Sequence, residues 1–379
     1  MNRSDQLTFA LVGVGGISQS QHLPNLQRAP HIHLKTICDL QPDLLKAVSE
    51  RYGIRSATCS FEEVLADPGI EAVLVATRPE SHAHLVIEAL NAGKHVYVEK
   101  PLADTEEECR KVQAAKAATG RELAVAFNRR MAPAYQLARK ILRASGGAYN
   151  LHYRIADAFH IWGKASGLSP GSRVLHEVCH IFDLLRFLTE SEIVTLHCLT
   201  SRHDDEAMLL QFANGCVATI LSSGYATYDM PKEHLEVMTE LGSLTVSDYV
   251  ELRTFGLEGF QPIYRFAGHT HPDRDHTHRY LFEKGGEEMM LTLRKVHYEA
   301  WKRASTSPDH HHYLQHHAPS LNYMMNKGWL ESVDHFAHSI LQGQPSQLAT
   351  VEDGLKATRL CEAAVRSREE RRCIHLQPA

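Results

Sequence analysis

The chain has 379 residues, of which 43% are hydrophobic and 22% charged, with a formal net charge of −5. This length predicts two domains, and the balanced composition gives no indication of nucleic-acid or membrane-surface binding. No apolar stretch reaches the roughly 18 residues that a membrane span needs, and the N-terminus lacks the pattern of a secretion signal. We therefore expect a cytoplasmic globular protein whose eight scattered cysteines are reduced.

Strand and helix patterns alternate through residues 7–128. Apolar runs predict strands over 7–13, 33–39, 71–77, 95–101 and 123–128, and helical patterns cover 19–28, 42–53, 61–67, 81–93 and 105–120. The last of these helices has Thr105 as its N-cap and glutamates in its first turn. This alternation is typical of an α/β fold with a doubly wound parallel sheet and right-handed crossovers.

A different pattern begins near residue 150. Turn signals such as Asn214-Gly215 separate predicted strands over 149–159, 193–201, 206–226, 232–248 and 249–255, and helices are expected over 173–188, 328–343 and 350–370. An antiparallel sheet with helices indicates an α+β domain, so we place the first domain at residues 1–130 and the second at 131–379. Residues 260–322 fit neither pattern. They are polar and rich in histidine, and we interpret them as an insertion.

A dinucleotide fingerprint, Gly13-x-Gly15-x-x-Ser18, lies between the first strand and the first helix. Gly13 permits a tight turn, and Gly15 lets a pyrophosphate approach the backbone at a helix N-terminus. Asp39 ends the second strand, where a carboxylate can accept hydrogen bonds from a ribose 2′-hydroxyl. Because no arginine follows Asp39 immediately, NAD is favoured over NADP. The alternative is that Asp39 only caps the following helix.

The most specific motif in the chain is ATRPESHAHLVIEALNAGKHVYVEKPLA, residues 76–103. It resembles the glucose–fructose oxidoreductase / inositol dehydrogenase (Gfo/Idh/MocA) family, on the residues Thr77 to Pro79, His82, Gly93-Lys94-His95 and Glu99-Lys100-Pro101. Asn128-Arg129-Arg130 and the segment RVLHEVCHIFDLLRFL (173–188) are also similar to that family. The resemblance covers nearly all of the chain except 260–322.

The resemblance implies an N-terminal Rossmann domain and a C-terminal α+β domain with a large open antiparallel sheet. In this family the sheet serves oligomer contacts, so a homodimer or homotetramer is expected, and the cleft between the domains takes a sugar, cyclitol or related polyol. No metal is expected. The cofactor contacts implied are Gly13, Gly15, Gly16, Ile17, Asp39, Thr77, Arg78, Pro79, His82, Glu99, Lys100 and Asn128.

The resemblance also implies the catalytic residues. Oxidation of a secondary alcohol needs a base at the hydroxyl and a cation that stabilises the developing alkoxide. Lys100 would bond the reacting hydroxyl and the nicotinamide side, and His180 takes the catalytic histidine position of the family. His176 stands where many members carry aspartate, which puts the usual aspartate–histidine pairing in doubt. Glu177 is the alternative source of that carboxylate.

The same helix contains His176-Glu177-x-x-His180, a pattern found in zinc hydrolases. In that interpretation both histidines bind zinc and Glu177 activates water. The insertion supplies candidates for the third ligand: His269, His271, His276, His278 or His310 to His312. Otherwise the insertion is a lid over the ligand or a surface excursion. The family resemblance explains the helix without a metal.

We therefore expect an NAD-dependent oxidoreductase that acts on a secondary alcohol of a sugar, cyclitol or sugar derivative. One alternative keeps the fold and changes the reaction to glycoside hydrolysis, through transient oxidation by NAD, elimination, hydration and re-reduction. In that case His176 or Glu177 would serve as a second base. A zinc-dependent hydrolase is the lesser alternative, and a nucleotide sensor without turnover is a further one.

Overall fold

The computed structural model describes residues 5–160, 172–201, 205–227, 229–269, 277–304 and 324–376. The chain forms two compact units, Met1–Met131 with Gly328–Leu360, and Ala132–Lys327 with Cys361–Ala379. The sequence places 328–360 in the second domain, whereas in the structure this segment packs with the first unit. No helix among the described residues is long and apolar enough to cross a bilayer.

The first unit contains a six-stranded parallel sheet in the order β3-β2-β1-β4-β5-β6. Its strands are β1 (Leu7–Val12), β2 (Ile32–Cys38), β3 (Ser56–Thr58), β4 (Ala72–Val75), β5 (His95–Val98) and β6 (Leu123–Val125). The predicted doubly wound sheet is confirmed. The short strand β3 was not predicted, because its three residues are largely exposed and carry no apolar run.

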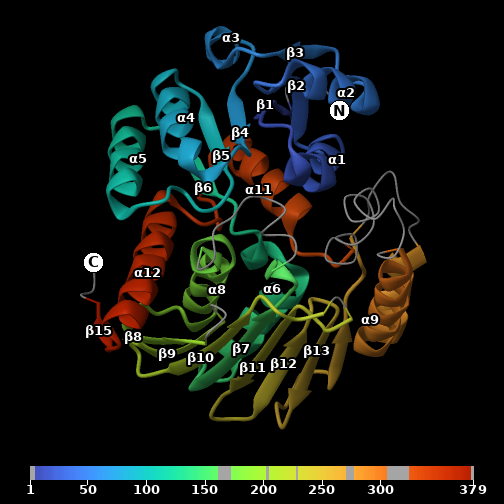
Figure 1. Ribbon diagram of the computed structural model, residues 1–379, viewed down its shortest axis with the longest axis vertical. Helices are drawn as coiled ribbons and strands as arrows, with labels where there is room; N and C mark the ends of the chain where they lie inside the picture. The colour runs from blue at the N-terminus through green and yellow to red at the C-terminus, as the bar shows by residue number, and fades with distance from the viewer. Residues whose placement is uncertain are drawn as a thin grey trace. The chain divides into compact units, whose positions relative to one another are not determined.

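Helices pack on both faces of this sheet, with α1 and α2 on one side and α4 and α5 on the other (Figure 1). Their bounds are η2 (Ser18–His22), α1 (Leu23–Leu26), α2 (Pro42–Tyr52), α3 (Phe61–Ala66), α4 (Pro79–Asn91), α5 (Glu106–Thr119), η3 (Asn128–Met131) and α11 (Trp329–Gln342). The predicted cap of α5 is present, since the Thr105 hydroxyl accepts a hydrogen bond from the Glu108 N–H. The predicted helix 19–28 begins instead with the π-helical turn η2.

The core of the first unit explains why 328–360 belongs to it. On α11, Phe336 packs edge-to-face against Phe9 and Tyr97, with ring centroids 6.2 and 5.7 Å apart. The buried Tyr97 hydroxyl is 2.7 Å from the hydroxyl of Ser332, also on α11. Burying a large aromatic side chain contributes about 1.5–3 kcal/mol, so the apolar face of α11 stabilises this unit. In the chain, α11 follows the 196 residues Ala132–Lys327 of the other unit.

The second unit contains a nine-stranded sheet in the order β14-β13-β12-β11-β7-β10-β9-β8-β15. Its strands are β7 (Asn150–Ala156), β8 (Ile193–Thr200), β9 (Glu206–Phe212), β10 (Val217–Ser223), β11 (Glu233–Met238), β12 (Ser243–Ser247), β13 (Glu251–Phe255), β14 (Ile263–Arg265) and β15 (Ile374–His375). The pairing is antiparallel except between β7 and β10, which run parallel. The predicted open, mostly antiparallel sheet is confirmed.

Among the described residues, helices cover one face of this sheet and leave the other uncovered. Figure 1 shows α6 (Pro133–Ala144) and α8 (Cys179–Thr189) over the covered face. Alternate residues of β9 are buried and exposed, and Leu209 on the uncovered face is 55% exposed. Two further helices belong wholly or partly to this unit, α9 (Thr277–Ala304) and α12 (Val351–Glu370), the latter from residue 361 onward.

The expected insertion at 260–322 contains regular structure. Strand β14 joins the edge of the sheet, and α9 contacts it. The helix breaks at Gly286, where φ is +54°, and the Glu251 carboxylate lies where a Cβ atom would stand. The polar sequence gave no clear signal for this helix, because only part of the helix packs against the rest of the unit.

Candidate active site

The predicted cofactor residues of the first unit follow the carboxyl ends of five parallel strands. Gly13 to Ile17 follow β1, Asp39 follows β2, Thr77 to Pro79 follow β4, Glu99 and Lys100 follow β5, and Asn128 follows β6. Because parallel strands end at one edge of the sheet, these residues gather at the edge where doubly wound sheets bind ligands.

The glycine loop has the geometry that its sequence predicts. Gly13 has φ of +90°, and a Cβ atom there would lie 2.5 Å from the carbonyl oxygen of Ala76, so only glycine fits. Beside Gly15 and Gly16 the space is open within 4 Å. Ser18, at the third position of the motif, donates a hydrogen bond from its hydroxyl to the Gly13 carbonyl at 2.6 Å. The loop is therefore tight at its start and accessible where a pyrophosphate would bind.

Asp39 is tied to the glycine loop. Its Oδ2 accepts a hydrogen bond from the Val14 N–H at 2.9 Å, and its Oδ1 accepts one from Gln41 at 3.0 Å. The N-cap residue of α2 is Gln41 rather than Asp39. A carboxylate oxygen has two lone pairs, so both oxygens keep acceptor capacity for a ribose diol. The glycine loop and Asp39 therefore fit a dinucleotide: the loop is open where a pyrophosphate would bind, and the Asp39 carboxylate can accept hydrogen bonds from a ribose.

Lys100 is fixed through its neighbour Glu99. The Glu99 Oε1 lies 2.8 Å from Nε2 of His22, and both side chains are buried. The Glu99 Oε2 accepts a hydrogen bond from the Lys100 N–H at 3.1 Å. Burial alone would raise the pKa of Glu99, but the hydrogen bond and charge of His22, with the charge of Lys100, hold it below its usual value. The Lys100 side chain is partly exposed at this anchored position.

His82 connects the turn after β4 to the segment after β5. Its Nδ1 lies 2.7 Å from the Pro101 carbonyl oxygen and its Nε2 lies 3.2 Å from that of Thr77. Burial lowers the pKa of His82. A neutral imidazole has one N–H, and the shorter contact assigns that proton to Nδ1. His82 therefore holds the Pro101 backbone through this hydrogen bond. Lys94, from the same motif, donates to the carbonyls of Asp67 and Ile70, near the amino ends of β4 and β5.

Two amides that the sequence did not single out lie on the first helical segment. The Gln21 and Asn25 side chains are fully buried, and their four polar atoms have no hydrogen-bond partner among the described residues. Gln21 and His22 lie in η2, and Asn25 lies in α1. Buried amides normally have partners, so ordered water or a polar ligand would satisfy these groups.

The second unit carries the other predicted residues on one helical segment. The π-helical turn η4 (Val174–Val178) contains His176 and Glu177, and α8 follows with His180 in its first turn. The Cys179 N–H donates to the Val174 carbonyl, five residues back, which makes this turn wider than an α-helical one. His176 is partly exposed, while Glu177 and His180 are buried. The sequence predicted a regular helix here and not the wide turn.

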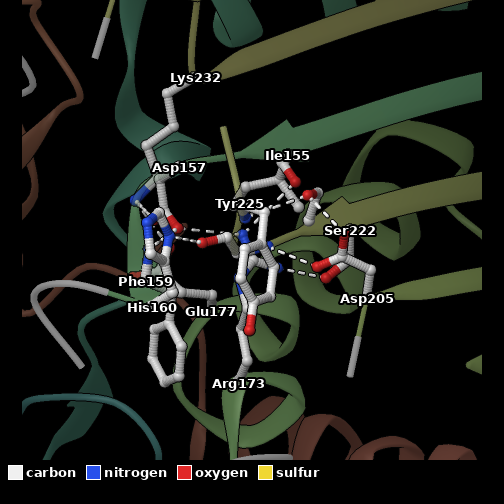
Figure 2. Close-up of polar contacts among 12 residues, drawn as sticks. Ile155, Asp157, Phe159, His160, Arg173, Glu177, Asp205, Ser222, Tyr225 and Lys232 are labelled. Atoms are coloured by element: carbon white, nitrogen blue, oxygen red, sulfur yellow. Dashed lines mark hydrogen bonds and ion pairs between the residues drawn. The ribbon is translucent and has the colours of Figure 1, made fainter. Parts of the chain in front are cut away.

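Glu177 forms an ion pair that the sequence did not reveal. Its Oε2 lies 2.9 Å from Nζ of Lys232, which lies just before β11. The same Nζ is 2.9 Å from Oδ2 of Asp157, at the end of β7. Figure 2 shows Lys232, Asp157 and Glu177 in this cluster. All three residues are buried, so the Glu177 carboxylate is engaged by a cation from the sheet.

Arg173 extends this cluster to a third strand. It is the N-cap residue of η4, and its guanidinium lies 3.5 Å from Asp157 Oδ1 and donates to the Ser222 hydroxyl. Ser222 donates in turn to Glu206 at 2.7 Å. Burial raises the pKa of Glu206. One feature of the sequence could have indicated this network: charged residues stand at the ends of strands, next to apolar residues.

No group of three or more metal-ligating side chains gathers among the described residues. Of the candidate third zinc ligands, His269 is buried, and its backbone N–H donates a hydrogen bond to the Met324 carbonyl. The side chain of His278 lies outside the described residues, as do His271, His276 and His310 to His312.

The six-stranded parallel sheet and the glycine loop together define a Rossmann-type unit with a dinucleotide-binding loop. Residues 7–127 match the model of the oxidoreductase family with an NAD-binding Rossmann fold, and residues 149–245 match that of the GFO/IDH/MocA C-terminal domain. The chain belongs to the Gfo/Idh/MocA family. The resemblance expected from residues 76–103 is confirmed.

The chain is similar to dehydrogenases named for inositol and levoglucosan. It is 30% identical over 263 residues to inositol 2-dehydrogenase of Rubrobacter xylanophilus, covering 64% of this chain and 72% of that protein. It is 27% identical over 292 residues to levoglucosan dehydrogenase of Pseudarthrobacter phenanthrenivorans, covering 63% and 72%.

Solved structures share the fold over nearly the whole chain. An oxidoreductase domain protein of Kribbella flavida superposes with a TM-score of 0.75 at 21% identity, covering 98% of this chain and 100% of that one. The scyllo-inositol dehydrogenase of Lactobacillus casei, with bound NAD(H) and scyllo-inositol, gives a TM-score of 0.71 at 18% identity, covering 98% and 99%.

Proposed function

We propose that this protein catalyses the NAD-dependent interconversion of a secondary alcohol and a ketone on a sugar, cyclitol or sugar derivative. The observation that carries the proposal is the anchored Lys100, which follows Glu99 at the carboxyl end of β5 in the family's NAD-binding domain. Relatives named for inositol and levoglucosan support the substrate class.

Bound NAD would supply the hydride acceptor, and Gly13 to Ile17, Asp39 and the turn Thr77 to Pro79 are the residues that would hold it. The protein's own residues must then remove the proton of the substrate hydroxyl and stabilise the negative charge on its oxygen. A protonated Lys100 side chain donates a hydrogen bond to the substrate oxygen and stabilises negative charge as it develops. The salt bridge between Glu99 and His22 keeps the adjacent backbone in place.

His180 is the proposed base. An imidazole exchanges protons near neutral pH, which suits removal of a hydroxyl proton. His176 is one turn earlier and partly exposed, so we propose a substrate contact for it. Glu177 is already paired with Lys232, which favours a structural task over that of a second base.

A substrate panel tests this function. Purified protein is incubated with NAD or NADP and with inositol isomers, hexoses and anhydrosugars, and NADH formation is followed by absorbance. We expect NADH with at least one of these polyols. Release of the aglycone from aryl glycosides without net NADH would instead establish the redox-assisted glycosidase, and stoichiometric zinc with no redox activity would establish the metallohydrolase.

We also propose self-association through the uncovered face of the nine-stranded sheet. Leu209 and Leu221 are about half exposed there, on adjacent strands, and Phe255 on β13 is 50% exposed. Apolar side chains in such number on an open sheet favour burial against a second copy. Light scattering should give a dimer or tetramer, and Leu209→Glu should shift it toward the monomer. A monomeric wild-type chain would contradict this.

A further inference from the structure

A single lysine joins the candidate catalytic turn to the sheet beneath it. Lys232 Nζ lies 2.9 Å from Glu177, within η4, and 2.9 Å from Asp157, at the end of β7 (Figure 2). Lys232 itself begins the segment that becomes β11. Three elements distant in the chain therefore meet at one ammonium group.

In this cluster each buried charge is stabilised by a charge of opposite sign. Asp157 and Glu177 are two buried carboxylates, and neither would remain ionised in an apolar interior without a cation. Within the described part of the chain, Lys232 and Arg173 are the cations paired with them. Removing one partner of a buried pair leaves the other charge uncompensated, so such a cluster resists rearrangement.

The cluster holds η4 at both ends. Arg173 precedes the turn and Glu177 lies near its end, and His176 lies between them. A π-helical turn is a rare and less regular conformation, so ties on both sides restrict where the His176 backbone can lie. His180 follows in the first turn of α8, which continues directly from η4.

We propose that Lys232 is a positioning residue for the catalytic turn: by bridging Asp157 and Glu177 it fixes the place of His176 and His180. This rests on the proposed function. Lys232 acts through the turn and not on the substrate, so its loss lowers kcat by displacing the histidines. Displacements of about 1 Å can cost about 100-fold in rate.

The second unit contains a matched control. Lys327 is also buried, and its Nζ lies 3.6 Å from Oε1 of Glu233, a residue of β11. The Glu233 carboxylate also accepts hydrogen bonds from the Tyr153 and Tyr249 hydroxyls, each at 2.6 Å. Lys327→Met thus removes a buried lysine from a carboxylate of the sheet, whereas Lys232→Met removes one from the carboxylate of η4.

The experiment compares Lys232→Met, Lys232→Arg and Lys327→Met in the full-length protein. Amide hydrogen exchange of residues 173–180 and the kinetic constants are measured at a temperature where each variant is folded. We expect exchange of 173–180 to accelerate about tenfold in Lys232→Met and kcat to fall about 10- to 100-fold, with NAD affinity unchanged. Lys232→Arg should recover most of both, and Lys327→Met should keep both near wild type.

Unchanged exchange and kcat in Lys232→Met would overturn the proposal, as would equal losses in Lys327→Met. If Lys232→Met does not fold, Asp157→Asn, which removes one of the two anchors, should show the same losses in smaller measure, and wild-type behaviour of that variant would also overturn it. A wild-type protein without turnover would refute the proposed function, while the exchange measurement would still decide the role of Lys232.

Discussion

The two units each contain one π-helical turn among their described residues, and the two turns are held differently. In η2 the Leu23 N–H donates to Ser18, and in η4 the Cys179 N–H donates to Val174, five residues back in both cases. The first turn is fixed by a buried pair of His22 with Glu99. The second is fixed by Lys232, which lies outside any catalytic motif, together with Arg173 at the N-cap of the turn itself.

The difference teaches which half of a site a sequence reveals. In the first unit the partner of the helical turn, Glu99, belongs to the same short motif as Lys100, so the motif marks both the anchor and the reactive group. In the second unit the anchor of Glu177 is Lys232, 55 positions later in the chain and without a motif of its own. The pairing of Glu177 with Lys232 depends on how β7 and β11 pair in the folded sheet, so the sequence alone does not indicate it.

Replacing the reactive group of the first unit should have the largest effect. Lys100→Ala should lower kcat by about 10³-fold or more, because it removes a charge that acts on the developing alkoxide. NAD affinity, measured by fluorescence titration, should stay within a few-fold. Turnover that survives the substitution would show that Lys100 does not stabilise the developing alkoxide.

The histidine of the second unit should come next. His180→Ala should lower kcat by about 10²- to 10⁴-fold, the usual contribution of a general base. The melting temperature checks that the buried site tolerates the change. His176→Ala should cost less and act mainly on KM. An ordering in which His176→Ala lowers kcat more than His180→Ala would reverse the roles proposed for them.

The ribose contact should be weaker. Asp39→Ala should weaken NAD binding about tenfold, the loss of a charge-assisted hydrogen bond, and should improve NADP relative to NAD. Because Asp39 also accepts from Val14, part of the loss comes from the glycine loop. Asp39→Asn keeps the size of the side chain and serves as the control. An unchanged NAD-to-NADP ratio would mean that Asp39 does not contact the ribose.

The salt bridge of the first turn should appear in the pH dependence of stability. The pKa of Glu99 is lowered in the folded state, so its ionisation stabilises the fold above its ordinary value of 4.5 and this stabilisation is lost as the pH falls below that value. Urea unfolding should therefore show Glu99→Gln less stable than wild type near neutral pH, with a gap that narrows on acidification. A gap that widens would contradict this sign.

Much of the fold followed from local patterns. The alternating strands and helices of 7–128, the Thr105 cap and the residues at the strand ends depend on signals within a few positions of each other. Residues 328–360 did not follow, because their membership in the first unit depends on Phe336 packing on Phe9 across more than 300 positions. The helix α9 and both π-helical turns carry no periodicity that distinguishes them from their alternatives.

Deuterium transfer tests the central claim most directly. The protein is incubated with NAD and with ring-deuterated polyols from the panel, and the reduced cofactor is isolated and examined by mass spectrometry. We expect deuterium in the reduced cofactor for wild type and its loss in Lys100→Ala. Turnover of the polyol without deuterium in the cofactor would contradict the account.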